Sequence, residues 1–291
     1  MYVLLYNPKS KNNKSFKIVT KLRTYFKKND ILCDFKNILL INDYEQFIKS
    51  LENEHKIIII GGDGTFSNFM RNIKDIEFEN KIYLYPAGTG NDFIKNFKTP
   101  HNIEMFNKVE KLRKLKADLP NVKMNGKEHH FINGIGIGFD GEVASKVNAS
   151  RLKNTFSYLT MSIKTVFNYE CYDMEAIIDG EVIHFKNVWL SSIQNGQYFG
   201  GGMKICPAAL LDDNLLDVCI IHSLSKIKFL VLLPTVFSGN HLKYKDFVYY
   251  RQAKDIKLKL NQKKTGQLDG DLFNLTSEIH VHLKNKFFNL F

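Results

Sequence analysis

The stretch that most constrains the fold runs from Lys56 to Thr65 and reads Lys-Ile-Ile-Ile-Ile-Gly-Gly-Asp-Gly-Thr. An unbroken run of β-branched residues that ends in glycines is typical of a strand buried on both faces, as in a parallel sheet. We expect a helix to follow from Phe66. The glycines would let a ligand approach the backbone closely, because no Cβ stands in the way.

A helix that begins after this turn would direct free N–H groups and the positive end of its dipole at the turn. Phosphate is the usual ligand at such a position. Asp63 is unexpected there because its carboxylate would repel an anion, and a Mg²⁺ ion between carboxylate and phosphates would resolve this conflict. The local sequence leaves a second interpretation open, a tight strand-to-helix turn with Asp63 as a cap.

Strands and helices alternate over the first part of the chain. The expected strands are residues 2–6, 57–60 and 82–85 and a strand with its loop over 31–41. The expected helices are residues 15–28, 43–51 and 103–115, with another starting at the 86–92 motif. This alternation is typical of an α/β domain with a parallel sheet, whose ligand binds at the carboxyl ends of the strands. The loops 7–10, 61–65 and 86–92 would therefore lie together at one edge.

The rest of the chain consists mainly of short β-rich runs separated by glycines, Asp/Asn turns or charged residues. These runs are residues 117–123, 129–137, 174–178, 182–195, 216–222, 255–260 and 278–283. Such spacing favours a mostly antiparallel sandwich or barrel, interrupted here by helical segments at 156–169 and 225–237. We predict two domains, 1–117 and 118–291, and the C-terminal tail is a candidate to pack back onto the first.

The formal net charge of +11 favours anionic partners, namely a nucleotide, a nucleic acid or an acidic membrane surface. The four cysteines lack metal-ligand spacing and are expected to be free thiols in a reducing compartment. The longest apolar run, residues 229–237, is too short to span a bilayer. We expect a cytoplasmic protein that contacts the inner face of the membrane peripherally.

Several motifs are spread over nearly the whole chain. They are GGDGT at 61–65, PAGTGNDF at 86–93, NGIGIGFD at 133–140, GGG at 200–202, CPAA at 206–209, DD at 212–213 and QLDGD at 267–271. In this order the set resembles the diacylglycerol kinase catalytic family, in its soluble bacterial lipid kinase branch. GGDGT alone also occurs in NAD kinases, so the complete set carries the resemblance.

The resemblance implies an NAD-kinase-like α/β domain with a parallel sheet, followed by a mostly antiparallel β-sandwich domain. It also implies ATP as the cofactor. The residues that it assigns to the nucleotide are Asn7, Ser10, Gly61, Gly62, Asp63, Gly64, Thr65, Ser67, Asn68, Gly88, Thr89, Asn91 and Asp92. Among these, Ser67 and Asn68 would open the helix, and the family's first-loop glycine is replaced by Lys11.

The resemblance further implies a Mg²⁺ site in the segment from Leu210 to Leu215. Asp213 would supply a carboxylate, and the backbone carbonyls of Leu210 and Leu215 would complete the shell together with water. The family pattern Asp-Gly is Asp213-Asn214 in this chain, and Asn tolerates the left-handed conformation, so we expect the turn to be retained. Without the resemblance, this segment would be interpreted as a solvated turn.

The family's catalytic Asp-Gly-Glu is Asp269-Gly270-Asp271 in this chain. The resemblance assigns Asp271 as the general base and Asp269 as its partner. A carboxylate is retained, but its side chain is one methylene shorter, and the position of such a group affects the rate strongly. A plain hairpin turn is the alternative interpretation of this tetrapeptide.

Taken together, the resemblance predicts a Mg²⁺- and ATP-dependent kinase that phosphorylates a lipid hydroxyl, with diacylglycerol as the first candidate substrate. The alternatives are a sphingoid-base or other lipid kinase, an NAD kinase, and a nucleotide- or lipid-binding regulator without catalysis. Segments 152–167 and 242–251 mix basic and aromatic residues, which suits an anionic membrane, although ordinary packing explains most such segments. We expect no nucleic-acid partner, and the oligomeric state stays open, with a homodimer as one alternative.

Overall fold

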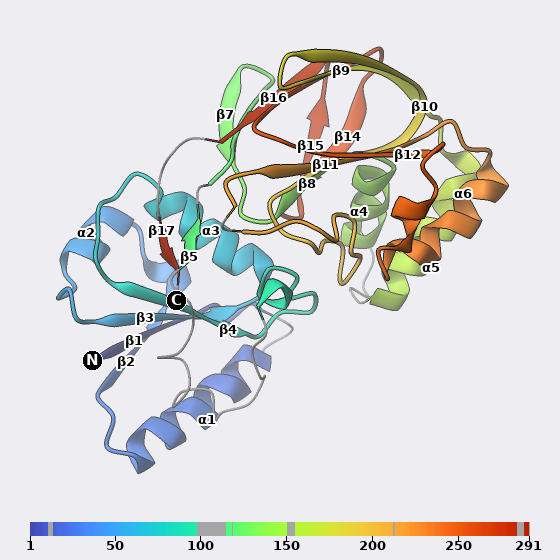
Figure 1. The fold of residues 1–291 in the computed structure, drawn as a ribbon. Helices are drawn as coiled ribbons and strands as arrows, with labels where there is room; N and C mark the ends of the chain where they lie inside the picture. The colour runs from blue at the N-terminus through green and yellow to red at the C-terminus, as the bar shows by residue number, and fades with distance from the viewer. Residues whose placement is uncertain are drawn as a thin grey trace. The chain divides into compact units, whose positions relative to one another are not determined.

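The structure is a computed structural model that describes residues 1–10, 14–97, 115–117, 119–149, 155–211, 213–283 and 288–290 of the 291-residue chain. The chain divides into two compact units (Figure 1). Unit 1 comprises Met1–Ala117 and Lys286–Phe291, and unit 2 comprises Asp118–Asn285.

Within the described residues, unit 1 contains a six-stranded sheet of order β2-β1-β3-β4-β17-β5. Its strands are β1 (Tyr2–Tyr6), β2 (Cys33–Asn37), β3 (Lys56–Gly61), β4 (Lys81–Pro86), β5 (Leu115–Ala117) and β17 (Phe288–Leu290). The first four strands pair in parallel, and β17 is parallel to β4 and antiparallel to β5. The isoleucines of β3 are at most 2% exposed, which confirms the buried strand predicted from the unbroken apolar run.

The helices of unit 1 follow the strands along the chain. They are α1 (Lys14–Lys28), α2 (Tyr44–Lys49) and α3 (Asp63–Ile73), with short 3₁₀ helices η1 (Ile38–Leu40) and η2 (Ile94–Asn96). Helix α1 packs Leu22 and Phe26 against Leu4 and Ile58 of the sheet, as its apolar spacing predicts. The predicted helix over 103–115 lies outside the described residues except at Leu115, which belongs to β5.

Unit 2 is built on antiparallel strands throughout its described part. They are β6 (Asn121–Met124), β7 (Lys127–His130), β8 (Gly134–Gly138), β9 (Tyr172–Ile178), β10 (Glu181–Gln194), β11 (Leu216–His222), β12 (Val248–Ala253), β13 (Asp255–Leu260), β14 (Lys264–Leu268), β15 (Asp271–Leu275) and β16 (Glu278–His282). The main path is β15-β14-β8-β10-β9-β13-β16-β6-β7, and β11 pairs with β10 and β12. The predicted antiparallel architecture is confirmed.

The helices of unit 2 are α4 (Phe139–Ala149), α5 (Thr155–Asn168), α6 (Lys226–Leu232), η5 (Leu233–Val236) and η6 (Asn240–Lys243). They pack over their own apolar core, in which Trp189 of β10 stacks on Phe229 of α6 with ring centroids 4.2 Å apart. A separate apolar cluster lies among the strands. No helix in the described part of the chain is both long and apolar enough to cross a bilayer.

Two expectations about local structure are wrong. Helix α3 begins at Asp63 rather than Phe66, because the extended Gly62 serves as its N-cap. The run 129–137 is two strands, β7 and β8, since residues 131–133 form a buried connection. Segment 242–251 was named as a membrane candidate with ordinary packing as the commoner explanation, and its residues 248–251 belong to β12, which pairs with β11.

Candidate functional site

The turn between β3 and α3 presents backbone N–H groups at a helix start. The N-cap Gly62 makes no side-chain hydrogen bond, and its carbonyl accepts from the amides of Thr65 and Phe66 at 3.0 and 3.1 Å. The first N–H groups of any helix have no partner within it. A Cβ placed on Gly64 would meet no heavy atom within 4 Å, so the space above this turn is open to a ligand.

Two glycines bring the loops after β3 and β4 into contact. A Cβ on Gly62 would lie 2.7 Å from the Cα of Gly88, and a Cβ on Gly88 would lie 2.4 Å from the Cα of Gly62. The Ala87 amide also donates to the Gly61 carbonyl at 2.8 Å. The two loops therefore share one backbone surface at the carboxyl edge of the parallel sheet, where α/β folds bind their ligands.

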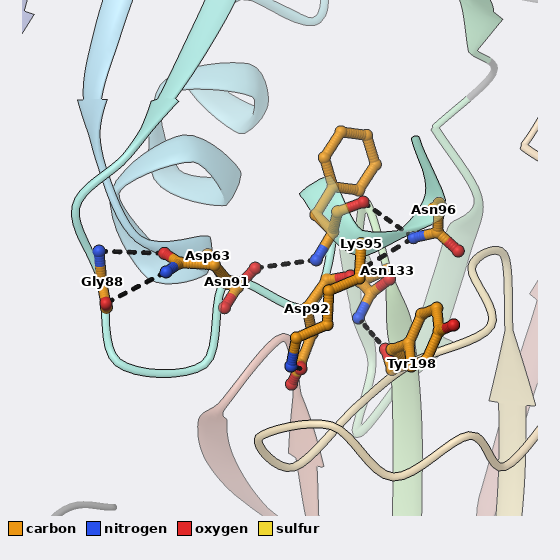
Figure 2. Close-up of polar contacts among 9 residues, drawn as sticks. Asp63, Gly88, Asn91, Asp92, Lys95, Asn96, Asn133 and Tyr198 are labelled. Carbon is orange, nitrogen blue, oxygen red and sulfur yellow. Dashed lines mark hydrogen bonds and ion pairs between the residues drawn. The ribbon is translucent and has the colours of Figure 1, made fainter. Parts of the chain in front are cut away.

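One carboxylate oxygen of Asp63 contacts the backbone that follows β4. Its Oδ1 accepts a hydrogen bond from the Phe93 amide at 2.9 Å (Figure 2). This bond gives the acidic residue of the glycine turn a positioning role, which the sequence analysis missed. No local pattern reveals it, because Phe93 lies 30 residues further along the chain.

The loop after β4 is shaped by its own side chains (Figure 2). Asn91 has φ 51° and exchanges two hydrogen bonds with the Gly88 backbone, at 2.9 Å through its oxygen and 3.1 Å through its nitrogen. The buried Asp92 pairs with Lys95 at 2.8 Å, and Asn96 donates to the Phe93 carbonyl at 2.8 Å. Asn91 and Asp92 thus fix the loop that carries Gly88.

Three other residues assigned to the nucleotide differ in exposure. Thr89 is exposed in the loop after β4. Ser67 is fully buried, whereas Asn68 is exposed and accepts a hydrogen bond from the Asn72 side chain at 3.2 Å. Both lie in the second turn of α3, so the expectation that they open the helix is wrong. A buried Ser67 hydroxyl faces the interior of unit 1.

The loop after β1 joins the same edge through Thr65. Asn7 Nδ2 donates to Thr65 Oγ1 at 3.2 Å, and the hydroxyls of Ser10 and Thr65 lie 3.3 Å apart. Ser15, in the first turn of α1, donates to the Asn7 carbonyl at 2.9 Å and fixes this loop. The structure therefore brings Asn7, Ser10 and Thr65 together beside the glycine turn, while Lys11 lies outside the described residues.

In unit 2, Asp269 anchors the turn of the β14–β15 hairpin. Its carboxylate accepts three backbone N–H groups, from Ile132 at 2.8 Å, Asn133 at 3.0 Å and Gly134 at 3.1 Å. Its own amide donates to the Gly134 carbonyl at 3.0 Å. This arrangement joins the hairpin to the start of β8 and makes Asp269 a positioning residue.

Asp271 is the exposed first residue of β15. A hydrogen bond within the hairpin stabilises the turn before Asp271, because the Gly270 amide donates to Gln267 Oε1 at 2.7 Å. Gln267 in turn donates to the buried Asp140 at 2.9 Å. The hairpin therefore holds Asp271 at an exposed position.

Asn133, in the motif NGIGIGFD, is a buried polar residue whose backbone amide contacts Asp269 of this hairpin, and Figure 2 shows its side chain beside Tyr198. Its Nδ2 donates to the Tyr198 carbonyl, and its backbone carbonyl accepts from Asn195 at 2.8 Å. Its Oδ1 is buried and has no hydrogen-bond partner among the described residues. Such an oxygen is costly to bury unsatisfied, so it is a candidate ligand contact that the sequence did not single out.

The segment proposed to bind metal forms the expected turn. Asn214 has φ 60°, which confirms that it occupies the left-handed position, and Asp213 Oδ1 accepts from the Leu215 amide at 3.0 Å. Gln252 Nε2 lies 3.4 Å from Asp213 Oδ2, and Leu210 is half-exposed. Across the described residues, no three His, Cys, Asp or Glu side chains gather closely enough to hold a metal ion.

A second carboxylate, Asp217, lies close to this turn on β11. The pKa of Asp217 is raised to about 6, mainly by burial and in smaller part by the nearby Asp213 charge, although the hydrogen bond that Tyr250 donates to Asp217 acts to lower it. An aspartate within the otherwise apolar run 216–221 was the available sequence signal. Because Asp217 is fully buried, it supports the turn from inside the sheet.

Two protein-family models match the two parts of the chain. Residues 1–122 match the diacylglycerol kinase catalytic domain, and residues 133–278, half of the chain, match the YegS C-terminal NAD kinase beta sandwich-like domain. A diacylglycerol kinase of Mycobacterium tuberculosis is 27% identical over 210 residues, which cover 69% of this chain and 65% of that protein.

Two solved structures share the fold. A diacylglycerol kinase of Bacillus anthracis aligns with a TM-score of 0.67 at 21% identity, covering 100% of this chain and 96% of that one. An NAD kinase of Archaeoglobus fulgidus in complex with ATP aligns with a TM-score of 0.51 at 13% identity, covering 100% and 93%. The chain therefore belongs to the diacylglycerol kinase catalytic domain family, in the form that also carries the YegS C-terminal NAD kinase beta sandwich-like domain.

Proposed function

We propose that the protein transfers the γ-phosphate of ATP to a lipid hydroxyl, and that the lipid is diacylglycerol, so that the product is phosphatidic acid. The observation that carries this proposal is the pair of glycine loops in unit 1, which touch through Gly62 and Gly88 beside the open start of α3. Family membership supports the reaction class.

Unit 1 is suited to hold the phosphates. The first amides of α3 and the positive end of its dipole favour an anion in the open space at Gly64. The side chains of Asn7, Ser10 and Thr65 add polar groups beside that space. Phosphoryl transfer depends mainly on positioning and charge neutralisation, which such a backbone cradle supplies.

Unit 2 supplies the candidate base. Asp271 would accept the proton of the lipid hydroxyl, whose oxygen then bonds to the γ-phosphorus while the bond to the β–γ bridging oxygen breaks and ADP leaves. Asp269 acts through its three backbone hydrogen bonds, which hold the hairpin that carries Asp271. The proton is thus transferred to Asp271 and the phosphoryl group to the lipid oxygen.

The metal turn fits a water-rich Mg²⁺ site. One carboxylate and two carbonyls, from Asp213, Leu210 and Leu215, would hold the ion, because Mg²⁺ usually keeps several waters. The left-handed Asn214 preserves the turn that presents them. When bound, the ion supplies positive charge that offsets the negative charge of ATP. The nearby Asp217 carboxylate adds negative potential that favours a cation at this turn.

A regulator that has lost catalysis is the second candidate, and the short side chain of Asp271 favours it. The experiment measures transfer of labelled γ-phosphate from ATP, with Mg²⁺, into an extracted lipid mixture that contains anionic vesicles. We expect a labelled phosphatidic acid band that falls at least about 100-fold in Asp271→Asn. Glu278→Gln, which removes an exposed carboxylate elsewhere in unit 2, is the control and should retain activity.

The outcomes separate the alternatives. A labelled band of different mobility would keep the kinase and correct the substrate. No labelled lipid from folded, ATP-binding protein would remove the diacylglycerol assignment. A large gain of activity in Asp271→Glu would favour a decayed enzyme, whereas equal or lower activity would favour Asp271 as a working base.

A further inference from the structure

Helix α6 and the segment before β12 form an apolar groove of about 280 Å³ on unit 2. We name it the α6 groove. Its lining includes Ile227, Val231 and Leu232 from α6, with Tyr244 and Phe247 from the following segment. The volume is just below the ~300 Å³ at which small-molecule pockets begin, so it suits part of one acyl chain rather than a whole lipid.

The groove is bordered by the most exposed apolar side chains among the described residues of unit 2. Ile227 is 76% exposed and Val231 is 66% exposed, and they lie one turn apart on the same face of α6. Phe167 at the end of α5 is 59% exposed, and Lys226 Nζ donates to its carbonyl at 2.5 Å, which places α5 beside α6. An exposed apolar face of this kind marks an interaction surface.

The charge around the groove is positive. Residues 223–247 contain four lysines, Lys226, Lys228, Lys243 and Lys245, all exposed, against one acidic residue, Asp246. Lys228 Nζ lies 5.0 Å from the centroid of the Phe247 ring, so its ammonium group lies over an aromatic ring that lines the groove. A face with apolar tips and flanking lysines is complementary to a bilayer surface that carries anionic lipids.

We propose that the α6 groove docks the protein on a bilayer containing anionic lipids, with Ile227 and Val231 entering the boundary between headgroups and acyl chains. The lysines bind lipid phosphates around the groove. The proposal rests on the proposed function, since it names where the protein meets the membrane that holds its substrate.

This surface overlaps only in part with the segments 152–167 and 242–251, which the sequence analysis named as membrane candidates. In the segment 242–251, Tyr250 donates its hydroxyl to Asp217 and Arg251 pairs with Glu181 at 2.5 Å, so both side chains already have partners in the sheet. Within that segment, Tyr244 and Phe247 line the groove. Helix α6, which carries the exposed aliphatic residues, was predicted only as a helix.

The test is co-sedimentation of the full chain with vesicles of equal parts phosphatidylglycerol and phosphatidylcholine, compared with pure phosphatidylcholine. The double variant Ile227→Asp/Val231→Asp should bind the anionic vesicles at least about tenfold more weakly. The matched control is Val182→Asp, which changes an exposed valine on β10 of the same unit and should bind like wild type. Circular dichroism of each variant verifies that unit 2 remains folded.

A second readout separates this proposal from the proposed function. The double variant should lose phosphorylation of diacylglycerol presented in the anionic vesicles but retain it on a short-chain diacylglycerol in solution. The docking proposal would be overturned if the folded double variant and wild type bound the anionic vesicles equally. It would also be overturned if wild type bound vesicles of pure phosphatidylcholine but not the anionic vesicles. If wild type phosphorylates no lipid but still needs Ile227 and Val231 to bind vesicles, the docking proposal stands and the kinase assignment fails.

Discussion

Gly64 and Gly88 belong to the same pair of loops, yet the structure gives them opposite requirements. A Cβ on Gly88 would lie 2.4 Å from the backbone of Gly62, so this position must be glycine for the loops to touch. A Cβ on Gly64 would meet nothing within 4 Å. Glycine at position 88 therefore permits the close contact between the two loops. Glycine at position 64 leaves the backbone accessible to a ligand.

Alanine substitutions at Gly88 and Gly64 should affect the free energy of unfolding and the binding of ATP differently. Gly88→Ala should lower the free energy of unfolding by about 1–3 kcal/mol, because the backbone must shift to admit the methyl group. Gly64→Ala should keep or raise stability by up to ~1 kcal/mol, because alanine is favoured over glycine in a helix. Its methyl group should nevertheless weaken ATP binding.

Thermal unfolding and calorimetric titration with ATP measure the two effects. Gly64→Ala that binds ATP as tightly as wild type would show that the phosphates do not approach this turn. Gly88→Ala with unchanged stability would contradict the close approach of the two loops.

Sequence reasoning found candidate residues more readily than their roles. The glycines at 61–64 are visible because they cluster locally after an apolar run. The partner of Asp63 is 30 residues away, and the partners of Asp269 are 135 to 137 residues away. Such hydrogen bonds depend on the tertiary fold, so the sequence alone does not reveal that Asp63 and Asp269 also hold loops in place.

At the scale of elements, the β14–β15 hairpin has a useful counterpart. Asp269 and Gly270 have φ 49° and 92°, and Asp179 and Gly180 of the β9–β10 turn have φ 48° and 86°. Two positive φ values in a two-residue turn are the type I′ pattern. Asp179 also holds backbone amides, those of Lys254 and Asp255, each at 3.0 Å. The two turns share chemistry, but only the first precedes a candidate base.

Asp269→Asn should lower the free energy of unfolding by about 1–3 kcal/mol, because the carboxamide cannot accept all three amides. It should also lower kcat, since the Asp271 hairpin loses its anchor, while the KM for ATP stays near that of wild type. Asp179→Asn is the control, with a similar loss of stability and normal kcat. Equal kinetic effects of both variants would reduce the role of Asp269 to stability alone.

The predicted elements succeeded where the pattern was strong and local. Strand β3 and helix α1 follow directly from an apolar run and a helical spacing. Helix α4 was missed although Phe139, Val143 and Val147 recur at its buried face, because Gly141 interrupts the pattern. A Cβ on Gly141 would lie 2.3 Å from the Thr265 carbonyl oxygen, so the glycine serves close packing on β14.

At the scale of the molecule, unit 1 is made from two distant parts of the chain. Strand β17 pairs with β4 at Leu290 and Ile82, and with β5 along all three of its residues. Both of these neighbours belong to unit 1, whereas β16, which precedes β17 in sequence, pairs within unit 2. The stability of unit 1 should therefore depend on the last residues of the chain.

Truncation after Leu283 tests this dependence, because it removes β17 and leaves every strand of unit 2 intact. We expect unit 1 to lose about 1–3 kcal/mol of stability, as three backbone ladder positions lose their partners. Limited proteolysis mapped by mass spectrometry should then show early cleavage within residues 1–97, while a fragment covering 119–283 persists.

Added ATP should slow the early cleavage, because a ligand that binds the native unit stabilises it. Removal of Phe291 alone, which lies beyond β17, is the control and should leave the pattern of wild type. Equal cleavage of both units in the truncated protein would mean that β17 supports the whole chain rather than unit 1.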